Sequence, residues 1–144
     1  MGTTEKTVRQ TVAARIAAIG TPWNESKFVP SLLGIDPSSL AHGAFSVELP
    51  NGRTTGGRQK RPDNLEQAET TVIRFTWQVK PMNQVESYDS ALDAELLLIQ
   101  TLLATGWTSN FRFIYVSSLR SPVETGEWIR VEISFNALFY LNLE

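Results

Sequence analysis

The sequence predicts an α+β fold, with a single domain over residues 1–144, a mostly antiparallel sheet of about four strands, and two main helices packed on it. The last fifteen residues or so alternate apolar and polar side chains, which is typical of a long strand with one face in a core. Two other segments repeat apolar residues at steps of three and four, as helices do. Hydrophobic residues make up 42% of the 144, enough for one core.

The final strand, predicted over residues 127–141, is the most regular pattern in the chain. Its apolar face comprises Ile129, Val131, Ile133, Phe135, Ala137, Phe139 and Leu141. The opposite face carries Trp128, Leu138 and Tyr140, which is more apolar surface than a solvated sheet face normally has. We therefore take these three as candidates for a subunit interface; the alternative is that a helix of the same chain covers them.

Three further strands are predicted, over residues 44–49, 71–79 and 110–116. Pro122 and Gly126 turn the chain between the third of these and the final strand, so the last two strands should form an antiparallel hairpin. The predicted core comprises Phe75, Trp77, Leu96, Ile99, Phe113, Ile133 and Phe135.

The two helices have recognisable ends. The first is expected over residues 4–19, capped by Thr3 or Thr4 and ended by Gly20. The second is expected over residues 87–105, capped by Ser87 or Asp89 and ended by Gly106. Its central stripe is predicted to be Leu92, Leu96, Ile99 and Leu103, and this very apolar helix should lie on the sheet.

Residues 51–69 contain three glycines and almost no apolar side chain, so we expect an exposed, mobile loop. Its cations are Arg53, Arg58, Lys60 and Arg61. The loop is therefore locally basic, although the chain as a whole carries a net charge of −2. These four side chains are candidates for contact with a partner.

The composition argues against catalysis. The chain has no cysteine, and its single histidine, His42, lies in a stretch rich in Pro, Ser and Gly. Thiolate chemistry is excluded, and metal or triad chemistry has little to build on. We predict that the chain is not an enzyme and has no catalytic residue, no cofactor and no metal site. We also expect no signal peptide and no membrane span.

The order of elements resembles that of the tail terminator, or tail completion, proteins of long-tailed bacteriophages. The resemblance rests on residues 73–79, 88–103, 111–116 and 128–141. It implies a structural virion protein that closes into a hexameric ring, caps the tail tube, stops tube polymerisation and joins the tail to the neck. The implied partners are further copies of the chain, the tail tube protein and a neck protein. The implied location is the head-tail junction of the virion, after synthesis in the host cytoplasm.

Alternatives remain open at this level. The same layout occurs in other phage neck and head-tail connector proteins, and a small ligand-binding α+β domain would need a pocket with convergent polar groups. The basic loop would face the lumen or the tube end. It lacks interleaved aromatic residues, so passing contact with DNA is favoured over sequence reading.

Overall fold

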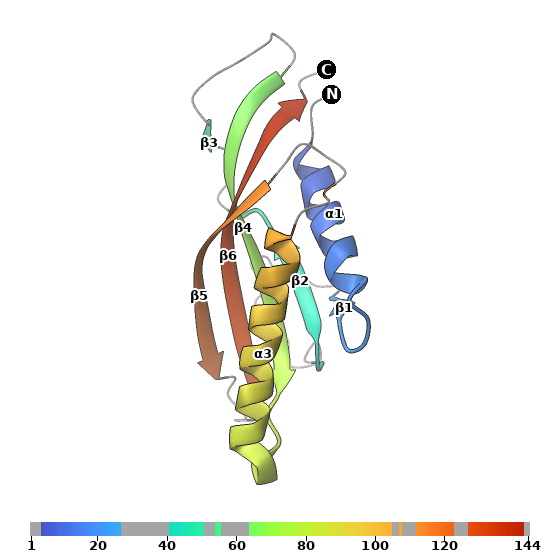
Figure 1. Ribbon diagram of the computed structural model, residues 1–144, viewed down its shortest axis with the longest axis vertical. Coiled ribbons are helices and arrows are strands. Elements are labelled where there is room, and N and C mark those ends of the chain that lie inside the picture. The colour runs from blue at the N-terminus through green and yellow to red at the C-terminus, as the bar shows by residue number, and fades with distance from the viewer. Residues whose placement is uncertain are drawn as a thin grey trace.

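A computed structural model describes residues 4–26, 41–50, 54–55, 64–104, 107, 112–122 and 127–142. For residues 54, 55, 64–68 and 140–142 it describes the backbone alone. The molecule is elongated, with its longest strands running along the long axis (Figure 1). The α+β class predicted from the sequence is confirmed.

Two α-helices and one short 3-10 helix are described. Helix α1 spans Glu5–Ala17, and the side chain of Thr4 caps it by accepting a hydrogen bond from the Thr7 amide at 3.1 Å. Gly20 follows with a φ of +103°, the left-handed conformation expected after a helix end. The 3-10 helix η2, Pro81–Asn83, leads into α3, Gln84–Leu103. Helix α3 thus begins three residues before the predicted start, and Ser87 is no cap, since its Oγ accepts a hydrogen bond from the Lys80 amide instead.

The strands form one mixed sheet, of six strands in the described part of the chain. They are β1 Asn24–Glu25, β2 Ala44–Glu48, β3 Thr54–Thr55, β4 Asn64–Gln78, β5 Arg112–Pro122 and β6 Trp128–Asn142. Their order is β1-β2-β4-β6-β5, with β3 paired to β4 at the side of this path. Only β1 and β2 run parallel. The predicted C-terminal hairpin is confirmed by the antiparallel pairing of β5 with β6.

Several predicted bounds need correction. Strand β4 starts at Asn64, so residues 64–69 belong to the sheet and Glu69 is buried, where the sequence suggested an open loop. The physical reason is β6, whose extra length supplies backbone partners up to the pair Asn64 and Asn142. Strand β5 continues to Pro122, six residues beyond its expected end. The two-residue strands β1 and β3 were not predicted, because two residues show no alternation.

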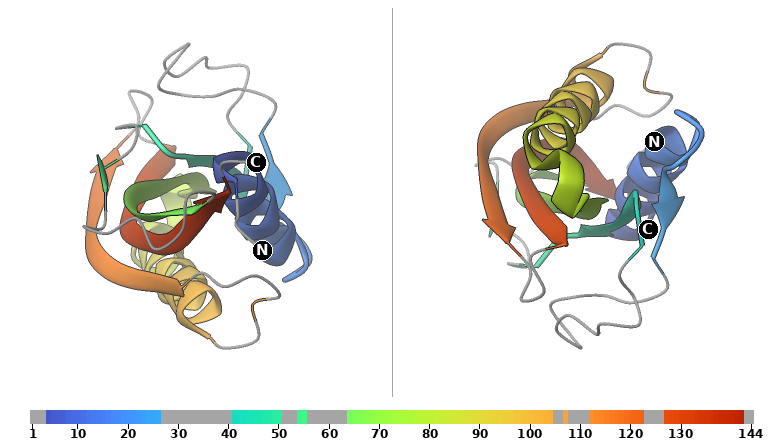
Figure 2. Two further views of the ribbon diagram at one scale, coloured as in Figure 1. Left: turned by 90° about the horizontal axis from the view of Figure 1, so that it is seen from above. Right: turned by 90° about the horizontal axis from the view of Figure 1, so that it is seen from below.

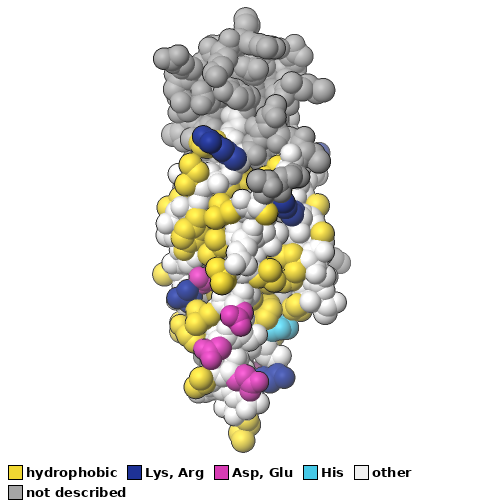
Figure 3. Space-filling view, in the orientation of Figure 1, with side chains coloured by type: hydrophobic (Ala, Val, Ile, Leu, Met, Phe, Trp, Pro, Cys, Tyr) yellow, Lys and Arg dark blue, Asp and Glu magenta, His cyan; other side chains and the backbone are white. Residues whose placement is uncertain are grey.

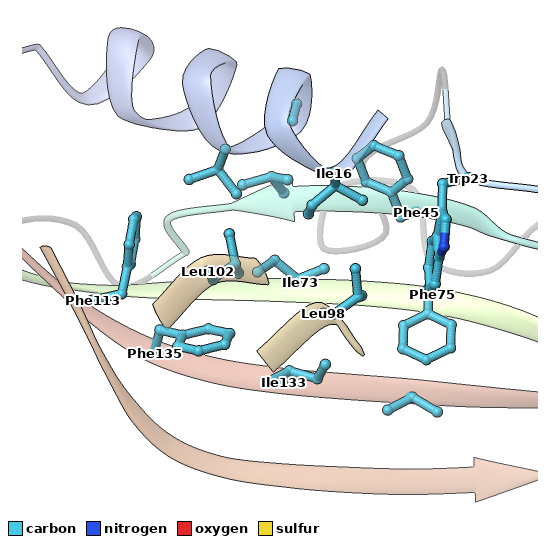
Figure 4. Packing of buried hydrophobic residues seen from close by; sticks show 14 of the residues in the cluster. Ile16, Trp23, Phe45, Ile73, Phe75, Leu98, Leu102, Phe113, Ile133 and Phe135 are labelled. Carbon is cyan, nitrogen blue, oxygen red and sulfur yellow. The ribbon is translucent and has the colours of Figure 1, made fainter. Parts of the chain in front are cut away.

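Both helices pack on one face of the curved sheet, here named the inner face (Figure 2). The core between them is continuous, from Ile16 on α1 and Leu98 and Leu102 on α3 to the aromatic rings of the strands (Figure 4). Of the predicted core residues, five are buried: Phe75, Trp77, Phe113, Ile133 and Phe135. Ile99 is partly buried against the core, whereas Leu96 is 52% exposed.

The exposure of Leu96 reflects the rotation of α3 about its axis. The residues that α3 buries are Ala91, Ala94, Glu95, Leu98 and Leu102. The predicted central stripe through Leu92, Leu96 and Leu103 is therefore wrong, because it lies away from the core. Apolar residues cover so much of this helix that spacing alone does not show which side is buried.

Strand β5 contains a β-bulge. Tyr115 pairs with Phe135 and Ser117 pairs with Ser134, so Val116 is an extra residue on β5 with no partner on β6. The alternation of side chains shifts by one position there. Phe113 points to the inner face before the bulge, and Arg120 does so after it.

Candidate interaction surfaces

Two of the three residues proposed from the final strand, Trp128 and Leu138, lie on the outer face of the sheet, opposite the helices. Trp128 pairs with Gln78 at one end of β6, and Leu138 pairs with Ala68 and Arg112 toward the other end. Both side chains are half-buried. The side chain of Tyr140 lies outside the described residues, as do all of Arg53, Arg58, Lys60 and Arg61.

Sequence reasoning missed a larger apolar surface on α3. The exposed large apolar side chains of η2 and α3 are Met82, Val85, Tyr88, Leu96, Leu97 and Leu103. Val85, Leu96 and Leu103 are separated by eleven and seven residues, so they fall on one line along the helix. The signal was present in the sequence, but it was assigned to the core. In Figure 3 apolar side chains run over the front of the molecule, where Figure 1 shows α3.

Carboxylates accompany this stripe. Glu86, Asp89 and Asp93 are exposed on the first three turns of α3, and the helix has no Lys or Arg. None of the three has an ion-pair partner among the residues the structure describes. Asp89, Asp93 and Leu96 are spaced four and three apart, so they are neighbours on the helix surface. Figure 3 shows the acidic groups interspersed with apolar ones over the lower half of the helix.

A second apolar surface covers the outer face of β5. Ile114, Val116 and Leu119 are 49%, 53% and 59% exposed. Cations flank them: Arg112 is exposed near one end of β5, and Arg130 of β6 pairs with Ser121 near the other. Neither arginine has an ion-pair partner within the described ranges. Leu138 lies beside Arg112 on the same face, and Trp128 is two residues from Arg130.

Other charged side chains of the outer face pair with one another within the subunit. Arg74 of β4 bonds to Glu132 of β6 at 2.5 Å and to Glu48 of β2 at 2.7 Å. The Glu48 side chain is only 4% exposed, so this group acts in the structure of the sheet. Arg112 and Arg130 are different, because their charges remain available to a partner.

An ion pair fixes α3 against β5 on the inner face. Arg120 donates from Nε and from one terminal nitrogen to the two carboxylate oxygens of Glu95, both at 2.7 Å. These hydrogen bonds raise the pKa of Arg120 above its ordinary value. Glu95 is one of the residues that α3 buries, so the pair forms on the side of the helix away from Leu96.

The one histidine borders a shallow pocket of about 300 Å³ between β4 and the start of α3. His42 Nδ1 accepts a hydrogen bond from the Gln78 amide at 3.1 Å, and its ring packs 4.1 Å from that of Trp77. Burial, and then the charge of Lys80, lower the pKa of His42 below its ordinary 6.5. The nearby hydroxyls of Ser87 and Ser90 accept hydrogen bonds from the Lys80 amide and from Trp77 Nε1. No described hydroxyl here bonds to His42, so the pocket lacks a paired nucleophile and base.

The described residues offer neither a metal site nor a membrane-spanning helix. They contain no group of three or more His, Cys, Asp or Glu placed to hold a metal ion. No helix among them is both long enough and apolar enough to cross a membrane.

Comparison with known proteins shows a likeness to a solved structure. The fold matches a chain in the solved structure described as the virion of a native gene transfer agent particle. The TM-score is 0.52 and the sequence identity is 13%, over 92% of this chain and 94% of that chain. No protein-family model and no curated protein matches the sequence. At this identity the likeness establishes a shared fold, and it extends over nearly the whole of both chains.

Proposed function

We propose that this protein is a structural component of a phage-like virion. In this proposal it forms a closed ring, of six copies by its resemblance to tail terminators, at the end of the tail tube. The ring stops tube polymerisation and joins the tail to the neck. Its partners are further copies of itself, the tube protein and a neck protein, and it acts at the head-tail junction without enzymatic activity.

The observation that carries the proposal is the exposed apolar stripe of α3, on a fold shared with a chain of a phage-like particle. A stripe that includes Val85, Leu96 and Leu103 is more apolar surface than a solitary subunit normally leaves in water. Edge strand β5 adds a second such surface. Two large contact surfaces on a small chain favour a subunit that is enclosed by neighbours.

The residues singled out from the sequence have places in this proposal. Trp128, Leu138 and Tyr140 contribute to contacts between subunits or with the tube. The basic cluster Arg53, Arg58, Lys60 and Arg61 faces the lumen or the tube end, where it contacts protein or passing DNA. Contacts made by this basic cluster should weaken as the salt concentration is raised.

Deletion of the gene in the particle that encodes it tests the proposal. We expect tails of irregular, excessive length and heads without tails in negative-stain images, because nothing stops the tube or joins it to the neck. Expression of the wild-type chain from a plasmid should restore tails of uniform length attached to heads. Tails of normal length that still attach to heads without the protein would refute the proposal.

A further inference from the structure

We propose that adjacent copies join through two different surfaces, the acidic helix face of one copy and the basic strand face of the next. The acidic helix face comprises Val85, Glu86, Asp89, Asp93, Leu96 and Leu103 of α3. The basic strand face comprises Arg112, Ile114, Val116 and Leu119 of β5 and Arg130 of β6. This inference rests on the proposed function for the ring, and it names the surfaces that close it.

The apolar parts of the two faces have matching character. Leu96 and Leu103 are about half exposed along one line of α3, and Ile114 and Leu119 are about half exposed along one line of β5. Each set is a narrow row bordered by charge, as expected of an interface with an apolar centre and a polar rim. Burial of the two rows against each other would remove the largest apolar side chains of both from water.

The charges are complementary, which is the reason for choosing a second copy as the occupant. The helix face carries the three free carboxylates Glu86, Asp89 and Asp93. The strand face carries two free guanidinium groups, those of Arg112 and Arg130. Arginine forms two hydrogen bonds to a carboxylate at once, so such contacts would fix orientation as well as add attraction.

The two faces cannot meet within one subunit, because the sheet separates them. Helix α3 packs on the inner face, whereas Ile114 and Leu119 point from β5 to the outer face. Association of one surface with a different surface of an identical chain is head-to-tail, and repetition of it gives a ring when the rotation closes. Two copies placed face to face through α3 would bring carboxylates together, which disfavours a symmetric dimer.

Cysteine cross-linking tests the contact directly, because the natural chain contains no cysteine. The double variant Leu96→Cys with Leu119→Cys is treated with a short bis-maleimide reagent, both as concentrated pure protein and in assembled particles. The proposal expects a ladder of covalent oligomers that ends in a closed ring. The matched control Gln10→Cys with Leu119→Cys has an exposed cysteine on α1 instead, and should remain largely monomeric.

Charge reversal gives an independent test. Reversal of the helix acids (Glu86→Lys, Asp89→Lys, Asp93→Lys) or of the strand cations (Arg112→Glu, Arg130→Glu) should each weaken association by roughly tenfold or more, because like charges then meet. The variant with all five changes should regain association, since both signs are exchanged. Thermal melts of every variant establish that the subunit remains folded.

The outcomes separate this contact from the proposed function. A Leu96→Cys single variant that gives abundant cross-linked dimers would overturn the head-to-tail contact in favour of a symmetric one. Absence of the ladder from both protein and particles would also overturn it. If deletion of the gene still gives overlong tails in that case, the ring function stands and its contact lies elsewhere. Normal tails together with a full ladder would refute the ring's role at the tail and leave the contact intact.

Discussion

Glu95 of α3 and Arg120 of β5 are joined by two hydrogen bonds of 2.7 Å, although they lie 25 residues apart in the chain. The Glu95 side chain is almost fully buried, and that of Arg120 is 41% exposed. The pair therefore connects the helix directly to an edge strand of the sheet. Loss of the Glu95–Arg120 pair should therefore destabilise both the helix and the strand.

Arg120→Ala should lower the free energy of unfolding by about 1 to 3 kcal/mol, because it leaves the buried carboxylate of Glu95 without its donors. Urea denaturation measures the change. Arg9→Ala is the matched control, since Arg9 forms an exposed ion pair with Glu25 at 2.8 Å and should cost less than about 1 kcal/mol. The double variant Glu95→Met with Arg120→Met should lose less stability than the two single changes combined. Strict additivity would show that the pair is not coupled.

Two leucines two residues apart on α3 should respond very differently to truncation. Leu98 is fully buried, so Leu98→Ala should cost about 2 to 5 kcal/mol of unfolding free energy. Leu96→Ala should change it by no more than about 0.5 kcal/mol in the monomer, because the side chain is half exposed and alanine favours helix. Thermal and urea unfolding at low protein concentration measure both. Equal losses would mean that α3 is rotated from the position described.

Protonation of His42 should destabilise the fold. Its pKa is lowered in the folded state, so the unfolded chain, with a pKa near 6.5, takes up the proton first as the pH falls. Stability should therefore decline below about pH 6.5, until the pH passes the folded-state pKa as well. Protonation of Nδ1 would also remove the acceptor that the Gln78 amide uses.

The measurement is the unfolding free energy of the wild-type protein and of His42→Gln between pH 7.5 and 5. As the pH falls, the wild-type protein should lose more unfolding free energy than His42→Gln does. An unchanged difference would exclude His42 as the titrating group.

Gly43 should tolerate alanine less well than Gly20. Both have positive φ, +79° and +103°, so alanine at either site costs about 1 to 2 kcal/mol in backbone strain. A Cβ at position 43 would in addition lie 2.4 Å from the backbone oxygen of Pro22, whereas nothing lies within 4 Å at position 20. Calorimetric melting should show the larger fall for Gly43→Ala. The reverse order would show that the backbone at Pro22 can move aside.

The sheet was more predictable from sequence than the helix surface. Alternation along β6 has two possible faces, and a run of seven apolar residues selects one of them, so the burial of Ile133 and Phe135 follows directly. Helix α3 has apolar residues around most of its circumference. The choice between Leu96 and Leu98 is set by contacts with distant segments, such as that of Glu95 with Arg120, which no local pattern records.

Among the candidate surfaces too, the sequence predicted some residues and missed others. Trp128 and Leu138 were placed correctly on the outer face of β6, because alternation fixes the face. Leu119 of β5 was missed, because it lies beyond the predicted end of that strand and after a bulge that has no signature in a run such as Phe113 to Ser117. The stripe through Leu96 was recognised but assigned to the interior, since sequence periodicity does not distinguish burial by the same chain from burial by a neighbour.

The bulge at Val116 determines which side chains of β5 face outward. Because Val116 has no partner on β6, every residue after it presents the side opposite to the one that uninterrupted pairing would give. Closure of the bulge, with Val116 paired to Ser134, would turn Leu119 toward α3 and Arg120 toward the exterior. That slip of one position would exchange an apolar contact for a cationic one and separate Arg120 from Glu95 in the same event. Deletion of Val116 itself would instead restore uninterrupted pairing and leave both side chains on their present faces.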